Sequence, residues 1–148
     1  NKKCTLTIAG DGRDLDEVKK YVEKKEIDHI EFWGHVNAET KKKALFQSHI
    51  MIFPTFTEGL PNVILEGMLY GMPIISRATG GIPEIVHQGI HGYISDSFEP
   101  EIFAIFLDVL ANDSNLYKTI SERNHVVAKK NFTSEKVKER FLKIIQDC

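Results

Sequence analysis

Two glutamates, Glu58 and Glu66, stand eight positions apart in the middle of this 148-residue sequence. The apolar run that ends at Phe53 predicts a buried strand, and Pro61 predicts the first residue of a helix, where its missing N–H costs nothing. Glu58 therefore falls in the loop between them, and Glu66 falls inside the helix. Carboxylates, prolines and glycines are crowded from Phe53 to Ile94 beyond what a core requires, and we interpret this stretch as a binding site.

The predicted helix start has the chemistry of an anion site. The amides of Asn62, Val63 and Ile64 have no acceptor inside the helix, so they point out of its N-terminus. Such amides, together with the helix dipole, favour a bound phosphate. Gly59, just before the helix, is expected to add its own amide.

Glu66 lies among side chains that are almost all apolar, and a helix that is apolar nearly all round is expected to be buried. A buried carboxylate must be paired or hydrogen-bonded. An ionised carboxylate has only acceptors, whereas the vicinal diol of ribose or another sugar offers two donors. The pattern therefore predicts a site for a nucleotide diphosphate joined to a sugar. The structural alternative is that Glu66 pairs inside a network of the fold and that Glu58 is a solvated loop residue.

The elements that must position these residues alternate along the chain. Strands are predicted at residues 4–9, 29–33, 50–53, 73–76 and 92–95, and helices at 15–26, 38–47 and 62–70, with a helical turn at 82–86. Three further helices follow, from residue 100 to a turn at 112–114, then at 115–130 and 134–146. Short strands alternating with helices predict an α/β fold, a Rossmann-like three-layer domain with a mainly parallel sheet flanked by helices. We expect one domain over residues 1–148, with its site at the carboxyl ends of the strands.

The composition of the chain limits the classes of function that we expect. The formal charge of −2 gives no general reason to expect nucleic-acid binding. Cys4 and Cys148 lie at opposite ends, which indicates neither a disulfide framework nor a thiolate metal site, and we expect a reducing, cytoplasmic compartment. The six histidines lack ligand spacing, so no metal is expected. No apolar run reaches the roughly 20 residues of a membrane span, so the chain is expected to be soluble.

Three segments carry a family resemblance: residues 58–67 (EGLPNVILEG), 71–75 (GMPII) and 79–86 (TGGIPEIV). Together they strongly resemble the donor-binding half of the retaining family 4 glycosyltransferases of the GT-B fold. Residues 10–12, 32–36, 92–94 and 132–134 look like further parts of the same pattern, so the resemblance covers nearly the whole chain. The glutamate pair alone is moderately specific, but its combination with the downstream Gly-Gly-Ile-Pro-Glu is highly specific.

The resemblance implies roles for particular residues. Glu58 would contact hydroxyls of the transferred sugar, and Glu66 would contact the ribose hydroxyls. The backbone from Gly59 through Leu60, Pro61 and Asn62 to Val63 would hold the pyrophosphate and sugar, and Val36 would lie beside the base. The implied reaction transfers a sugar from a UDP-, GDP- or ADP-sugar to an acceptor hydroxyl with retention at the anomeric carbon. Such a reaction serves glycan, polysaccharide or glycolipid synthesis, for instance in the cell envelope, and no cofactor or metal is implied.

The sequence also departs from the family pattern. The Arg and Lys that clamp the diphosphate in the family precede the first strand of this sequence, as does the N-terminal acceptor domain. We therefore expect a fragment of a longer enzyme, which alone binds donor weakly and transfers little or nothing. Arg13 and Arg77 match neither cation and receive no role here. Peripheral membrane association of the full-length enzyme stays open.

The sequence leaves three other functions open. In a glycosidase, Glu58 and Glu66 would lie roughly 5 Å or 6.5–9.5 Å apart across the scissile bond. The helix start argues against that reaction, because a hydrolase gains little from an anion pocket. A sugar-nucleotide epimerase on the same scaffold and a non-catalytic nucleotide-binding module are the other two.

Overall fold

The computed structural model describes residues 4–146, so Cys148 lies outside the described residues. The chain divides into two compact units, Asn1–Gln47 and Ser48–Cys148. Each unit has its own parallel sheet, flanked by helices. The predicted alternation of parallel strands and helices is confirmed, whereas the single domain over residues 1–148 stays a prediction.

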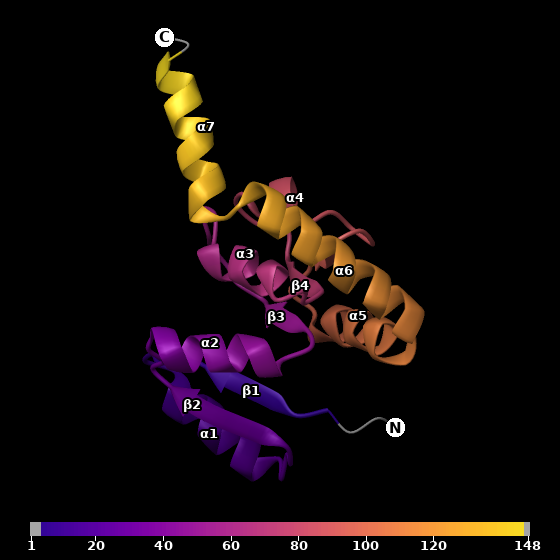
Figure 1. Ribbon diagram of the computed structural model, residues 1–148. Coiled ribbons are helices and arrows are strands. Elements are labelled where there is room, and N and C mark those ends of the chain that lie inside the picture. The colour runs from indigo at the N-terminus through magenta and orange to yellow at the C-terminus, as the bar shows by residue number, and fades with distance from the viewer. Residues whose placement is uncertain (1–3, 147–148) are drawn as a thin grey trace. The chain divides into compact units, whose positions relative to one another are not determined.

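The first unit contains two strands, β1 (Leu6–Ala9) and β2 (Ile30–Gly34), which pair in parallel. Helix α1 (Leu15–Lys24) connects them, and α2 (Ala38–Gln47) follows β2 (Figure 1). Acidic residues in the first turn of α1 and Lys24 in its last turn both complement the helix dipole. Leu45 is the buried residue of α2.

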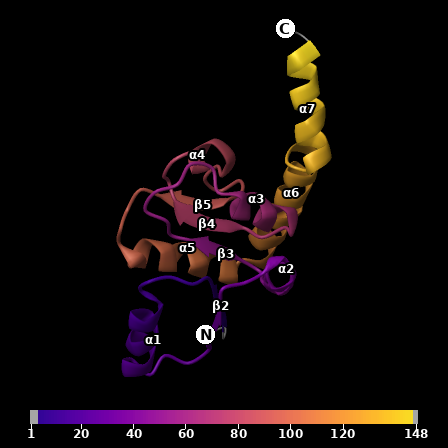
Figure 2. The same ribbon diagram turned by 90° about the vertical axis from the view of Figure 1, so that its left-hand side faces the viewer.

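The second unit is built on three parallel strands in the order β3-β4-β5: β3 (Met51–Phe53), β4 (Ile74–Arg77) and β5 (Gly92–Ser95). Helix α3 (Asn62–Leu69) joins β3 to β4, and the short α4 (Ile82–Ile85) joins β4 to β5 (Figure 2). All four residues of the central strand are buried. Burial on both faces explains why β4 begins with two consecutive isoleucines, Ile74 and Ile75, instead of alternating apolar and polar residues.

The two faces of β4 belong to two apolar clusters. Ile74 packs with residues of α3, α4 and α6 (Ser114–Asn131), and the buried members of that cluster are Ile64, Met68, Ile74, Ile82, Val86 and Ala128. Ile75, the next residue, points to the opposite face and packs with Leu110 of α5 (Pro100–Asn112) and Ile120 of α6. The core therefore forms on both sides of β4.

Helix α3 ends as the sequence predicts. Gly71 takes a φ of +76°, its amide donates to Met68 O (2.9 Å), and the amide of Met72 donates to Gly67 O (3.0 Å). This is the Schellman arrangement, in which a left-handed residue closes the helix. A side chain at Gly71 would also meet Ser121 of α6, so the position excludes a Cβ on two grounds.

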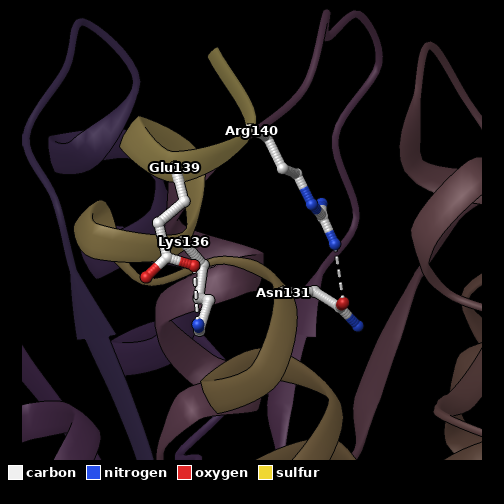
Figure 3. Close-up of polar contacts among 4 residues, drawn as sticks. All are labelled: Asn131, Lys136, Glu139 and Arg140. Carbon is white, nitrogen blue, oxygen red and sulfur yellow. Dashed lines mark hydrogen bonds and ion pairs between the residues drawn. The ribbon is translucent and has the colours of Figure 1, made fainter. Parts of the chain in front are cut away.

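Helix α7 (Ser134–Gln146) follows α6 along the chain. Arg140 donates to Asn131 Oδ1 at the end of α6 (2.8 Å), and Lys136 pairs with Glu139 within α7 (2.7 Å) (Figure 3). The apolar side chains of the predicted stripe that the structure describes, Val137, Phe141 and Ile145, are exposed. Within residues 4–146, no helix is both long enough and apolar enough to cross a bilayer.

Two details of the prediction were wrong. Pro61 is not the first helical residue but the N-cap, with φ −73° and ψ 114°, and α3 begins at Asn62. Helix α3 is also not buried all round, because its buried residues are Ile64, Gly67 and Met68 and its remaining side chains are at least partly accessible. The other predicted boundaries lie close to the observed ones, and those of α2, β5 and α7 coincide with them.

Candidate functional site

The loop after β3 carries Glu58 at the carboxyl end of the three-stranded sheet. Its side chain is half-buried, and Oε1 accepts a hydrogen bond from Thr55 Oγ1 at 3.4 Å. The Thr55 hydroxyl also lies 3.3 Å from Thr57 O, so the loop folds back on itself. Glu58 is therefore held by its own loop instead of extending freely into solvent.

The Gly80-Gly81 turn, more than 20 residues later, packs against this loop. Gly80 has a φ of +56°, and a Cβ built there would overlap the carbonyl oxygen of Glu58. The amide of Gly81 donates to Gly59 O at 2.7 Å. The two motifs that stand apart in the sequence thus form one piece of structure at the ends of β3 and β4. The glycines are required because backbone approaches backbone.

The start of α3 differs in part from the predicted anion site. The amide of Ile64 donates to Pro61 O at 3.1 Å and is not available to a ligand. Asn62 and Val63 remain the residues whose amides precede the first intrahelical bond. The exposed Asn62 and Leu60 lie on either side of the buried Pro61, so the accessible backbone is that of the loop and first turn.

Glu66 faces a cavity of about 220 Å³. The cavity lies between α3 and the end of α6, and its lining residues are Asn62, Leu65, Glu66, Leu69, Ala128 and Phe132. The Oε2 atom of Glu66 is buried, whereas the residue as a whole is half-buried. Four of the lining residues are apolar, so the carboxylate and Asn62 are the polar groups through which a ligand there would be oriented.

The structure brings the predicted residues together only in part. Asn62 and Glu66 share the cavity, but Glu58, Gly59, Leu60, Pro61 and Val63 are not among its lining residues. Val36 is half-buried in the loop between β2 and α2 of the first unit. Across residues 4–146, no cluster of three or more His, Cys, Asp or Glu side chains could hold a metal ion.

A model of the family described as "Glycosyl transferases group 1" matches residues 1–127. The chain belongs to the glycosyl transferases group 1. The fold is that of a GT-B glycosyltransferase domain, in agreement with the resemblance of residues 58–86.

Curated relatives in this group are similar at a moderate level. An uncharacterized glycosyltransferase of Methanocaldococcus jannaschii, MJ1178, is 29% identical over 129 residues, which cover 87% of this chain and 36% of the relative. The N-acetyl-alpha-D-glucosaminyl L-malate synthase of Bacillus anthracis is 28% identical over 143 residues, which cover 96% of this chain and 37% of the relative. The chain thus spans little more than a third of the length of these relatives.

Solved structures show the same fold at lower identity. Anabaena Alr3699/HepE in complex with UDP-glucose has a TM-score of 0.85 and 18% identity, and the match covers 97% of this chain and 41% of that one. The C-terminal domain of a group 1 family protein, LpcC of Francisella tularensis, has a TM-score of 0.75 and 23% identity, and the match covers 88% of this chain and 70% of that one.

Sequence reasoning missed two residues of this glycosyl transferase domain. Arg77 is 9% exposed at the end of β4, and an arginine directly after the predicted strand 73–76 could have signalled a buried cation. The second residue is His91, which lies just before β5 and is 7% exposed. Its Nδ1 accepts a hydrogen bond from the backbone amide of His87 at 3.2 Å. In the sequence, only the next residue, Gly92, indicated close packing here, because its backbone lies against that of Ile74. Met68 and Met72 are buried in the core.

Proposed function

We propose that this chain is the donor-binding part of a retaining glycosyltransferase, which transfers a sugar from a nucleotide-diphosphate sugar to an acceptor hydroxyl. One observation carries the proposal: Glu66 and Asn62 line the same cavity, beside the first turn of α3, in a chain of the group 1 family. A diol-binding carboxylate next to accessible helix amides suits a ribose linked to a diphosphate.

In this proposal each part of the donor has its own partner. The ribose hydroxyls donate to Glu66, and the diphosphate accepts from the amides of Asn62 and Val63. Glu58 accepts from hydroxyls of the transferred sugar, along the backbone of Gly59, Leu60 and Pro61. Val36 lies beside the base. The assignment of Ile64 to the phosphate is dropped, because its amide already donates to Pro61.

The chemistry that this chain would supply is electrostatic. When the bond between the anomeric carbon and the diphosphate oxygen breaks, its electron pair leaves with the diphosphate and negative charge grows there. Amides fixed at the first turn of α3 stabilise that charge without reorganising. Removing one preorganised donor of this kind typically costs about 100- to 1,000-fold in rate. No metal or cofactor has a part in the proposed step.

The relatives support the proposal in different ways. HepE was solved with UDP-glucose bound, and LpcC is described as a C-terminal domain of the same family. Because this chain spans 36% and 37% of the two curated relatives, we propose that binding of the acceptor needs further protein. Alone, the chain is then expected to bind donor weakly and to transfer little sugar. A cytoplasmic location is part of the proposal.

The test is a titration of the ¹⁵N-labelled chain with UDP, GDP and ADP up to millimolar concentration, followed by NMR and by calorimetry. At least one of them should shift the amide signals of Asn62 and Val63. Glu66→Gln should weaken its binding about tenfold, which is a typical loss for hydrogen bonds to a charged group. Glu84→Gln, at an exposed position of α4, is the matched control and should bind like the wild type.

Two further ligands separate the roles. Inorganic pyrophosphate should bind the wild type and Glu66→Gln equally, because it has no ribose. The 2′-deoxy form of the preferred diphosphate keeps one of the two ribose hydroxyls. It should bind the wild type more weakly than the parent does and should lose less affinity on Glu66→Gln than the parent loses. The proposal fails if no diphosphate binds, or if Glu66→Gln binds all these ligands as the wild type does.

A further inference from the structure

Arg77 is a buried cation that holds two loops together. It is the last residue of β4, and its guanidinium donates to main-chain carbonyls of both flanking loops: Nη1 to Thr55 O (3.4 Å), Nε to Ser97 O (3.3 Å) and Nη2 to Asp96 O (3.0 Å). Thr55 belongs to the loop after β3, and the other two belong to the loop after β5. The five N–H groups of a planar guanidinium suit such a junction, whereas a lysine would present one nitrogen.

Two aromatic rings cover this guanidinium. The centroid of the Phe98 ring lies 3.8 Å from the Arg77 Cζ, and that of Phe56 lies 5.6 Å from it. The two rings also contact each other, with centroids 5.5 Å apart. Phe56 is 73% exposed and Phe98 is 65% exposed, so hydrophobic burial does not account for their placement. The cation–π contact does, because a guanidinium binds to the face of an aromatic ring.

Arg77 itself is not placed to bind a phosphate. Its nitrogens Nε, Nη1 and Nη2 each donate to a carbonyl of the protein, and the side chain is 9% exposed. Burial of a guanidinium is costly unless its hydrogen bonds are made inside the protein. The hydrogen bonds of its guanidinium are therefore used to hold the two loops.

The first of these loops carries Glu58. Thr55 accepts from Arg77 through its carbonyl, and its hydroxyl donates to Glu58 Oε1 at 3.4 Å. The same hydroxyl lies 3.3 Å from Thr57 O, so its one proton is shared between the loop backbone and the carboxylate. Thr55 thus connects Arg77, at the end of β4, with Glu58 through its own backbone and side chain. On its other side, the same loop is fixed by Gly81, whose amide donates to Gly59 O.

We propose that Arg77 is a positioning residue for the sugar of the donor. It acts through Thr55, which it fixes so that Glu58 is already oriented before the donor binds. The inference rests on the proposed function, in which Glu58 contacts the transferred sugar and Glu66 contacts the ribose. Loss of Arg77 should therefore reduce what the sugar contributes to the binding affinity of the donor. The contribution of the nucleotide to that affinity should stay unchanged. Preorganised groups of this kind improve binding because less order has to be gained on association.

The experiment compares the affinities for a nucleoside diphosphate and for its glucose conjugate, with UDP, GDP or ADP chosen by whichever the wild type binds. The readout is the ratio of the two dissociation constants, measured by calorimetry or NMR. Arg77→Met should weaken binding of the glucose conjugate about three- to tenfold relative to binding of the diphosphate. The dissociation constant of the diphosphate itself should stay near the wild-type value. Glu58→Gln should show the same signature. Loss of a residue that merely stabilised the fold would weaken the binding of both ligands to the same extent.

Arg123→Met is the matched control. Arg123 also donates from Nη1 to a loop carbonyl, Ile90 O, at 3.4 Å, but this loop lies before β5 and does not carry Glu58. The ratio should stay at the wild-type value. If Arg77→Met does not fold, Thr55→Val decides, because valine keeps the carbonyl that Arg77 contacts and removes the hydroxyl that donates to Glu58.

The outcomes separate this inference from the proposed function. If the wild type binds a diphosphate through Glu66 but Arg77→Met and Thr55→Val keep the wild-type ratio, the positioning role is refuted and the proposed function stands. If the wild type binds no diphosphate at all, both are refuted. A changed ratio in Arg123→Met as large as that in Arg77→Met would also count against a specific role for Arg77.

Discussion

Asn124 connects three elements of the second unit through a single side chain. It lies on α6 and is fully buried, and its Nδ2 donates to Met72 O and to His91 O, both at 2.8 Å. These carbonyls flank β4 and β5 at their amino ends, opposite to the site. A buried amide that donates to two carbonyls fixes α6 on the sheet more specifically than apolar packing can, because such bonds require a defined geometry. The His91 carbonyl also accepts from the amide of Ile74 at 3.1 Å, so it has a backbone donor besides Asn124.

Asn124→Ala should lower the free energy of unfolding by about 1–3 kcal/mol, because it removes two buried hydrogen bonds, one to the Met72 carbonyl and one to the His91 carbonyl, which keeps its bond from the Ile74 amide. Urea denaturation measures this change. Asn112→Ala is the matched control, since Asn112 Nδ2 also donates to a carbonyl, Asp108 O (2.9 Å), but at an exposed helix position. The control should lose less than about 1 kcal/mol. Equal losses in the two variants would show that burial of the Asn124 amide has no special effect.

We expect His91 to make the stability of this unit depend on pH. Burial lowers the pKa of His91 from its usual 6.5, and the nearby His87 and Arg123 lower it further. The unfolded chain therefore takes up a proton at a higher pH than the folded one does. The contribution of His91 to stability is complete above the unfolded pKa and is lost as the pH falls through 6.5 toward the lower folded value. Protonation of Nδ1 would also break the hydrogen bond from the His87 amide.

We expect the free energy of unfolding to fall between pH 7 and pH 5 more steeply in the wild type than in His91→Gln. Urea denaturation at several pH values measures the slope. His35→Gln replaces an exposed histidine and should keep the wild-type slope. An unchanged slope in His91→Gln would contradict the role of this side chain.

Among the elements, the turn between β4 and α4 decides how the Glu58 loop lies. Gly80→Ala would introduce both backbone strain at a φ of +56° and an overlap with Glu58 O. Gly89→Ala is a matched control, because Gly89 has a φ of +71° and nothing within 4 Å of a built Cβ. Both variants should lose about 1 kcal/mol from strain. Only Gly80→Ala should also shift the NMR signals of Glu58 and Gly59 and weaken binding of the glucose conjugate.

If Gly80→Ala left those signals unchanged, the turn would not control the loop. A weaker binding of the glucose conjugate by Gly89→Ala, equal to that of Gly80→Ala, would also show that strain alone explains the effect.

The sequence predicted the elements well because each is bounded by strong local signals. Gly71 and Pro73 end α3, and Asp113 caps α6 by accepting from the amides of Asn115 and Leu116. The position of Pro61 could not be resolved to one residue, because proline fits both the N-cap and the first turn. Residue roles that need distant partners were missed. Arg77 depends on loops about 20 residues away on either side, which no local pattern reports.

At the scale of the whole molecule, α7 contributes little to the stability of the second unit. Its described apolar side chains Val137, Phe141, Leu142 and Ile145 are exposed, and its hydrogen bond to the end of α6 joins Arg140 to Asn131. The exposed pair Lys136–Glu139 adds only a few tenths of a kcal/mol to the helix. The stabilising core lies instead around β4, in the two clusters with α3, α5 and α6.

We therefore expect the double variant Phe141→Gln and Ile145→Gln to keep the free energy of unfolding within about 0.5 kcal/mol of the wild type, because neither side chain leaves a buried site. The same variant should bind less of a hydrophobic dye such as ANS. Leu110→Ala, in the cluster beside Ile75, is the contrasting change and should cost about 2–5 kcal/mol. Urea denaturation of the three proteins measures the difference. A loss in the α7 variant comparable with that in Leu110→Ala would mean that this helix face is buried in solution.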